Sequence, residues 1–300
     1  MIAPPSLSVI ITSHNEGNEL ERTVRSVIEN THCLAEVIVV DEASTDDSCR
    51  DVVGDRVRVI RHERRVGVAY SRDEASRVAQ GNVLCYLDAH QRVRPNCLDR
   101  CARVALESQA ITCPDIRDFG FPRWRLYGVD FCLHPKRGYF TGKWRNWRLR
   151  RRVSPATALR APPYLLPRSI YPMIAWSQAL RGWGATEASV GVKAFFSGTR
   201  ILHVGGPLAL HLFRGRFHYE TTWDGVWRNH ALIARICFDD ATWFGHWLPR
   251  VFEPHLTPET HSALEAPEVQ AEHQEFLRTK IRTDRQFWTD LLRQPPPQGI

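Results

Sequence analysis

The chain has 300 residues, of which 43% are hydrophobic and 24% charged, and its formal net charge is +7. No apolar run approaches the roughly 20 residues that span a bilayer, so this composition excludes stable membrane insertion and is typical of a globular protein. Residues 1–6 lack the basic start and apolar stretch of a secretory signal, which predicts a cytoplasmic location. The eight cysteines form no CxxC pair, so we expect reduced, mostly buried thiols.

Four short apolar runs rich in β-branched residues predict strands in the first third of the chain. They cover residues 7–11, 36–40, 57–60 and 83–87. A helix capped by Asn18 follows the first run, and another helix begins near Pro95. This alternation predicts an α/β fold with a mostly parallel sheet and helices on both faces.

The apolar periodicity fails from Pro114 to Pro163, where Pro, Arg, Trp and Gly dominate and loops are expected. Within this stretch, the segment from Lys143 to Arg152 carries six basic residues among ten. Such a segment indicates either a solvated insertion or an anionic partner, and we expect a mobile loop over a binding site. No known nucleic-acid-binding motif is present, so nucleic acid is not an expected partner.

Regular structure is expected again after this stretch. The pattern predicts a helix over residues 187–196, a strand over 200–204 and a long helix over 226–237. The amphipathic tail from residue 258 predicts a helix that packs back before the prolines at 295–297.

Polar clusters follow three of the predicted strands directly. They cover residues 12–16 (TSHNE), 41–46 (DEASTD) and 88–90 (DAH). Ligands of open α/β sheets collect outside the carboxyl ends of the strands, so these clusters are expected to form one site.

Asp88 and His90 alternate with Ala89 on what should be extended backbone, so their side chains would leave the same face. A carboxylate oxygen and an imidazole nitrogen together suit Mn²⁺ or a similar divalent ion. Such an ion would neutralise a diphosphate leaving group. For an isolated motif, a capping aspartate and a solvated histidine would be the simpler interpretation. The choice between this interpretation and a metal site therefore depends on the rest of the sequence.

Two long segments, SVIITSHNEGNELERTVRSVIENT and EVIVVDEASTD, resemble the nucleotide-binding half of family-2 glycosyltransferases, which have a GT-A fold. The motifs HNE, RRVGVAYSR, VLCYLDAH and HLFR resemble more closely the polypeptide N-acetylgalactosaminyltransferases. Together these motifs extend from Ser8 to Arg214.

The resemblance implies a domain organisation. Residues 1–254 would form a GT-A catalytic domain, made of a nucleotide-binding half (1–113), a basic loop-rich insertion (114–162) and an acceptor and metal half (163–254). Residues 255–300 would form a helical tail.

The resemblance also implies roles for individual residues. The metal ligands would be Asp88, His90 and His211, with Mn²⁺ as the expected cofactor. The nucleotide would be held by Thr12, Glu16, Asp41 and Arg72. The sugar and acceptor side would be lined by Trp183, Glu187 and Arg214.

Two departures from the resembled family affect these roles. Ala185-Thr186-Glu187 stands where the family carries Gly-Gly-Glu, and Tyr70 stands where it usually carries a donor-binding arginine, with Arg72 as a nearby substitute. Glu187 could be a catalytic base, or only an acid favoured at a helix start. The DxH motif favours a retaining outcome, in which the leaving phosphate removes the need for a base.

The functional hypothesis is a metal-dependent glycosyltransferase that uses a nucleotide-diphosphate sugar, expected to be a UDP-sugar. The acceptor is open and could be a peptide, a glycan or a small molecule. A nucleotidyltransferase is an alternative, but it would ordinarily carry a Gly-rich loop with Arg or Lys where this chain has His14-Asn15-Glu16. A non-catalytic nucleotide- or carbohydrate-binding module is a second alternative.

Overall fold

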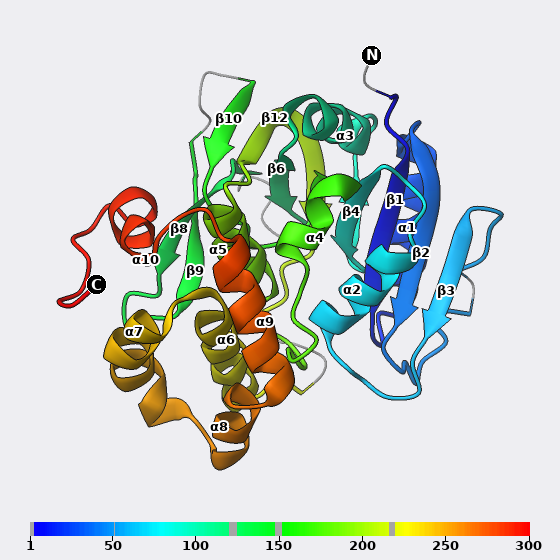
Figure 1. The fold of residues 1–300 in the computed structure, drawn as a ribbon. Coiled ribbons are helices and arrows are strands. Elements are labelled where there is room, and N and C mark those ends of the chain that lie inside the picture. Colours follow the sequence, from blue (N-terminus) through cyan, green and yellow to red (C-terminus); the bar gives the residue numbers. More distant parts are fainter. Residues whose placement is uncertain (1–2, 51, 120–124, 148–151, 216–219) are drawn as a thin grey trace.

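The computed structural model describes residues 3–50, 52–119, 125–147, 152–215 and 220–300. Its centre is a ten-stranded sheet with the strand order β10-β12-β6-β11-β4-β1-β2-β3, to which β5 and β7 add at β12 and β6 (Figure 1). The strands of this sheet are β1 (Leu7–Ser13), β2 (Leu34–Asp41), β3 (Val57–Arg61), β4 (Val83–Asp88), β5 (Gln91–Val93), β6 (Ile111–Asp118), β7 (Arg125–Leu126), β10 (Val153–Ala156), β11 (Tyr164–Pro167) and β12 (Ile201–His211). A separate two-stranded sheet contains β8 (Val129–Leu133) and β9 (Phe140–Trp144).

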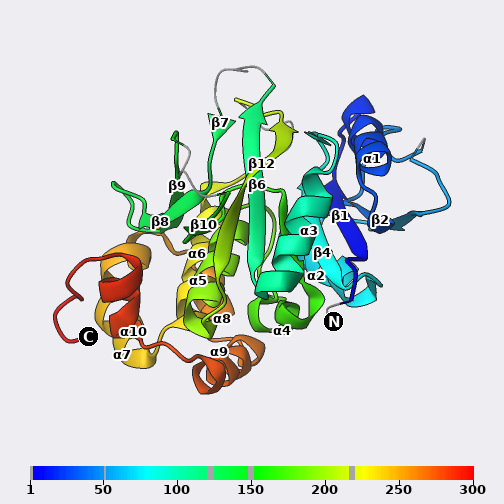
Figure 2. The same ribbon diagram turned by 90° about the horizontal axis from the view of Figure 1, so that it is seen from above.

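Helices cover both faces of the large sheet, as the sequence pattern predicts (Figure 2). They are α1 (Asn18–Asn30), α2 (Val68–Val78), α3 (Cys97–Ser108), α4 (Tyr171–Ile174), α5 (Thr186–Ser197), α6 (Trp223–Cys237), α7 (Asp240–Thr242), α8 (Pro258–Leu264), α9 (Pro267–Thr279) and α10 (Asp284–Gln286). Two π-helical segments, Trp243–Phe252 and Phe287–Leu291, continue α7 and α10. Among the described residues, no helix is both long and apolar enough to cross a bilayer.

The four strands nearest the N-terminus run parallel and in a register that brings their polar ends together. Thr12 lies opposite both Val40 of β2 and Asp88 of β4, and Ser13 lies opposite Asp41. The carboxyl ends of β1, β2 and β4 therefore meet at one edge of the sheet, which confirms the expected grouping of the three polar clusters.

Further along, the sheet is mixed and not mostly parallel. β11 runs antiparallel between β4 and β6, whereas β12 runs parallel to β6. The α/β class is confirmed, but the direction of β11 could not be predicted, because a short apolar run carries no signal of strand direction.

The loops expected between Pro114 and Pro163 are the main error of the sequence interpretation. Most of β6 and all of β7, β8, β9 and β10 lie in this stretch, and Lys143 belongs to β9. Pro155 fits because β10 is an edge strand, where a missing N–H costs no ladder bond. Of the basic segment, residues 148–151 lie outside the described part of the chain.

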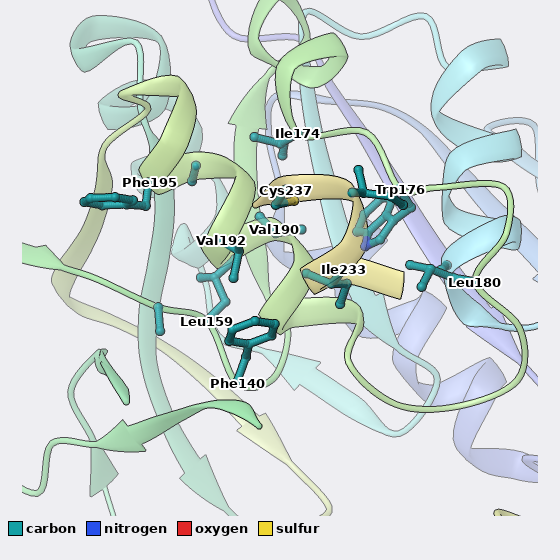
Figure 3. Packing of buried hydrophobic residues seen from close by; sticks show 14 of the residues in the cluster. Phe140, Leu159, Ile174, Trp176, Leu180, Val190, Val192, Phe195, Ile233 and Cys237 are labelled. Atoms are coloured by element: carbon teal, nitrogen blue, oxygen red, sulfur yellow. The ribbon is translucent and has the colours of Figure 1, made fainter. Parts of the chain in front are cut away.

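Each face of the sheet has its own core. On one face, α1 and α3 share a core with β1, β2 and β4 that includes Leu20, Val24 and Leu98, and α3 lies mainly against β6, β11 and β12. On the other face, a larger core surrounds α5 and α6, where Val190, Val192, Ile233 and Cys237 gather close to Phe140 and Leu159 (Figure 3).

Helix α1 begins one residue earlier than expected, since Gly17, and not Asn18, is its N-cap.

The tail beyond residue 255 packs against this larger core. α9 lies along α6, and Leu264, Val269, Phe287 and Trp288 are at most 4% exposed. At about 25 cal/mol per Å² of apolar surface, burying such large side chains contributes substantially to the stability of the whole unit.

Candidate active site

A cavity of about 470 Å³ opens at the carboxyl edge of β1 and β4. Its walls come from segments far apart in the sequence: the loops after β1 and β4, the start of α2, β9, the start of α5 and the end of β12. Nine of the ten expected site residues line it, namely Thr12, Glu16, Arg72, Asp88, His90, Trp183, Glu187, His211 and Arg214. Asp41 does not line it.

Asp88, His90 and His211 converge at this edge. Each residue offers one ligand atom, and these three atoms lie within 4.8 Å of one another. His211 Nε2 lies 3.1 Å from Asp88 Oδ2, and the two imidazole rings are 5.1 Å apart. The backbone at Ala89 and His90 is a turn and not the extended segment expected, and this turn lets β5 double back and pair with β12, opposite His211.

The electrostatics of this cluster keep Asp88 ionised. Burial disfavours its charge, but the hydrogen bond from His211 and the positive charge of Arg72 outweigh burial and hold the pKa of Asp88 well below its ordinary value. Because a carboxylate can only accept, His211 Nε2 donates to it. His211 Nδ1 is buried and has no hydrogen-bond partner within the described residues. One carboxylate and two imidazoles form a donor set that suits a divalent transition metal.

Glu16 fixes the orientation of His90. Its Oε1 lies 3.1 Å from His90 Nδ1, and its Oε2 accepts a hydrogen bond from Arg214 at 2.7 Å. Burial would raise the pKa of Glu16, but its contacts with His90 and Arg214 lower it overall. With Nδ1 engaged, Nε2 is the ring nitrogen that His90 can offer to a metal.

Arg72 joins the cluster of Asp88, His90 and His211 to the opposite wall. Its side chain is 1% exposed and contacts Asp88 at 3.1 Å through Nη2, and Glu187 at 2.7 Å through Nη1. The same Nη1 donates to the Tyr164 hydroxyl at 3.1 Å. Burial raises the pKa of the Glu187 carboxyl, and the Arg72 charge opposes this shift. The guanidinium is therefore already engaged by protein groups.

Two further expected residues, Asp41 and Trp183, differ in where they lie. Asp41 is fully buried, accepts from Ser44 N at 2.9 Å and pairs with Arg61, so it shapes the loop after β2. Trp183 is 39% exposed at the cavity, between two glycines with positive φ (Gly182, +63°; Gly184, +107°). Such backbone angles favour glycine, which explains why a glycine stands on each side of Trp183.

The sequence interpretation missed Glu42, which follows Asp41 in the chain and, unlike Asp41, lines the cavity. Its Oε2 accepts hydrogen bonds from Val66 N at 2.9 Å and Gly67 N at 2.8 Å, and its Oε1 contacts His62 and Ser71. Glu42 thereby ties the loop before α2 to the end of β2. Its place in the DEASTD cluster indicated that Glu42 could lie near the site, but the partners of its carboxylate could not be inferred from the sequence.

Gly67 is needed where this loop meets the loop that carries Trp183. It forms an isolated parallel bridge with Gly182, and a Cβ on Gly67 would lie 2.4 Å from Gly182 N. Because φ is also +112°, we expect Gly67→Ala to cost at least about 1–3 kcal/mol of stability, which corresponds to a fall in Tm of roughly 5 °C.

Differential scanning calorimetry would measure this loss, with Gly245→Ala as the matched control. A Cβ at Gly245 would meet nothing within 4 Å, so this variant should have nearly the parental Tm. Equal Tm values for the two variants would contradict the close-approach argument.

Parallel strands whose polar ends meet at one edge, with an Asp-His-His cluster at that edge, are arranged as in the GT-A type of nucleotide-diphospho-sugar transferase fold, which the solved structures described below share. The family description Glycosyl transferase family 2 matches residues 8–164, which is just over half of the chain. The chain belongs to this family.

The chain is also similar to curated N-acetylgalactosaminyltransferases. Polypeptide N-acetylgalactosaminyltransferase 8 of Drosophila melanogaster is 28% identical over 283 residues, which cover 84% of this chain and 46% of that protein. The human polypeptide N-acetylgalactosaminyltransferase 14 is 26% identical over 235 residues, covering 72% and 42%. This chain thus spans less than half the length of these two relatives.

Solved structures share the fold. GalNAc-T7 with UDP, GalNAc and Mn²⁺ matches with a TM-score of 0.73 at 20% identity, over 97% of this chain and 57% of that one. S. aureus TarS 1–349 in complex with UDP-GlcNAc matches with a TM-score of 0.56 at 14% identity, over 92% and 81%.

Proposed function

We propose that this protein is a metal-dependent glycosyltransferase that transfers a sugar from a UDP-sugar. The observation that carries the proposal is the convergence of Asp88, His90 and His211 at the edge of a cavity large enough for a small ligand. The two solved structures named above contain UDP or a UDP-sugar, which supports this donor class.

In this proposal, Asp88, His90 and His211 hold the divalent ion, expected to be Mn²⁺. When bound, the ion supplies positive charge that stabilises the diphosphate leaving group. Glu16 keeps His90 in the orientation that exposes Nε2, and Arg72 holds the Asp88 carboxylate in place. Thr12 and Arg214 line the nucleotide and phosphate side, whereas Trp183 and Glu187 line the sugar and acceptor side.

Arg72 was expected to hold the nucleotide, but its contacts favour a positioning role. A guanidinium that donates to two carboxylates and a phenol has few donors left for a phosphate. We therefore propose that Arg72 sets the separation of Asp88 and Glu187. Asp41 likewise would act on the nucleotide only through the loop that it shapes.

A panel of nucleotide sugars tests the function directly. Release of UDP from one UDP-sugar, together with a sugar-bearing product, is the expected result. A nucleotidyltransferase would instead attack the α-phosphate, transfer the nucleoside monophosphate and release a sugar 1-phosphate, and a binding module would bind donor without releasing UDP. The acceptor, whether peptide, glycan or small molecule, would follow from the same screen.

Metal binding is predicted to be measurable without turnover. Adding Mn²⁺ and UDP to metal-stripped protein should raise Tm, because ligands that bind only the folded state stabilise it by about 2.7 kcal/mol at 100 times Kd. For a domain of this size the shift should be roughly 5 °C. Asp88→Asn should lose most of the shift, and an unchanged shift in that variant would contradict the assigned ligands.

A further inference from the structure

The positive charge of this chain is concentrated in one stretch. Residues 128–162 contain nine of the 40 Lys and Arg residues and only one of the 33 acidic residues, Asp130. The rest of the chain is therefore close to neutral, and the whole excess of +7 resides in this stretch. A field this localised is expected to act on a binding partner, because evenly mixed surface charge creates no such potential.

The fold places described residues on both sides of 148–151 against the cavity. Phe140 to Gly142 and Trp144 of β9 line it, together with Leu159 to Pro162, which follow β10. Figure 1 shows the β8–β9 hairpin on the side of the molecule opposite β3, next to α5. Because Glu187 lies in the first turn of α5, this wall belongs to the acceptor side of the proposed site.

Two cations at or beside this wall have no carboxylate partner in the part of the chain that the structure describes. Arg160 lines the cavity, and its Nη1 donates to Gly142 O at 2.9 Å. Lys143 does not itself line the cavity, but it is exposed and shares a face of β9 with the cavity-lining Thr141. Asp130 lies opposite it on β8, yet Lys143 forms no ion pair within the described residues. By contrast, Arg145 is neutralised by Asp130 and donates to Pro155 O.

The neighbouring groups support this picture. Burial raises the pKa of the Cys132 thiol, and the charges of Arg160 and Lys143 oppose the shift, so both cations lie near the same point of β8. Arg137, in the turn of the hairpin, stacks on the cavity-lining Trp223 at 3.8 Å. Cations therefore reach the cavity from the hairpin and from the segment after β10.

The donor does not require these cations. Its diphosphate would be met by the proposed metal ligands and by Arg214, which lie at the ends of β4 and β12 or in the loops that follow them. The hairpin cations are left for the molecule that enters from the acceptor side.

We propose that the acceptor carries an anionic group, a phosphate or a carboxylate, close to the hydroxyl that receives the sugar, and that Arg160 and Lys143 bind this group. The proposal rests on the proposed function, because it concerns the acceptor of that reaction. Clefts lined by one sign of charge raise the local concentration and the association rate of oppositely charged molecules. Arg160 can also bind a phosphate or carboxylate through two N–H groups at once.

The test uses three fluorescent oligomers with free hydroxyls and different charge. They are chitotetraose (neutral), a hyaluronan tetrasaccharide (carboxylates) and a tetramer of glycerol phosphate (phosphodiesters). Anisotropy would give Kd for each oligomer on the full chain with Mn²⁺ and UDP. We expect at least one anionic oligomer to bind ten times more tightly than the neutral one, and the two anionic arms to distinguish carboxylate from phosphate.

Charge variants test whether Arg160 and Lys143 cause the preference for anionic oligomers. Arg160→Gln and Lys143→Gln should each weaken anionic binding roughly two- to fivefold, as for exposed ion pairs, and the double reversal to Glu should abolish the preference. Arg103→Gln, an exposed cation of α3 that does not line the cavity, should change nothing.

Several outcomes would overturn the proposal. They are no preference for either anion, an equal effect of Arg103→Gln, or a loss in affinity for UDP that is larger than the loss in affinity for the oligomer. Tighter, charge-dependent binding to a DNA duplex or to phosphatidylglycerol vesicles would assign the wall to that partner instead. Binding is measured without turnover, so a failure of UDP release would not be mistaken for a failure of this proposal.

Discussion

Replacing Asp88 by Asn is expected to reduce sugar transfer by at least about 100-fold. Asn has nearly the same shape but lacks the negative charge that a divalent ion requires, and it leaves the positive Arg72 beside the metal site. Removing a single group that stabilises developing charge typically costs 10²–10³ in turnover. The measurement is the initial rate of UDP release from the preferred donor at saturating Mn²⁺.

The chain offers a matched control for this variant. Asp115 is a buried carboxylate with His203 Nε2 at 2.7 Å, and His203 lies on β12, the strand that carries His211. Asp115 does not line the cavity, so Asp115→Asn should lower Tm and leave the rate per folded molecule nearly unchanged. Equal losses of activity in the two variants would mean that Asp88 acts through stability alone.

Replacing Glu187 by Gln should lower turnover by about 100-fold, the lower end of the range for a general base. The variant removes the carboxylate that pairs with Arg72 on the proposed acceptor side, and with it the charge that balances this arginine against Asp88. Burial already disfavours the charged form of Glu187, so Gln should cost only about 1 kcal/mol of stability. Rate and Tm are to be measured on the same preparation, with metal and donor saturating.

The anomeric configuration of the product separates the two origins of this loss. An inverted product would make Glu187 the base that deprotonates the acceptor. A retained product, which we propose, would leave that proton to the departing phosphate and make Glu187 a positioning residue. A rate within a fewfold of the parent would remove Glu187 from either role and leave its place at the start of α5 as a helix-end preference.

The edge of the sheet that positions the site was predictable because its signals are local. Alternating apolar runs specify β1, β2 and β4, and the polar residues that follow each run must lie at one edge once the strands are parallel. Thr12, Glu16, Asp88 and His90 were therefore found without knowing any contact between distant segments.

The path to His211 was not predictable in the same way. The expected strand ended at Val204, but β12 continues to His211 through Gly205, Gly206 and Pro207, with an irregular register against β6. Those three residues normally end a strand. The eleven-residue strand persists because β6 pairs with it on both sides of the interruption and β5 pairs with its last three residues.

What the sequence determined by itself was the fold class, the family resemblance and the residues at the ends of the first parallel strands, since each depends on local periodicity or on a contiguous motif. Only the tertiary structure decided that Arg72 bridges Asp88 and Glu187, that Glu42 fastens two loops together, and that the basic stretch contains the strands of a hairpin beside the cavity. These features depend on pairs of residues far apart in the chain, where packing and buried charge choose the partner. Packing and buried charge leave no periodic pattern in the sequence from which these partners could be predicted.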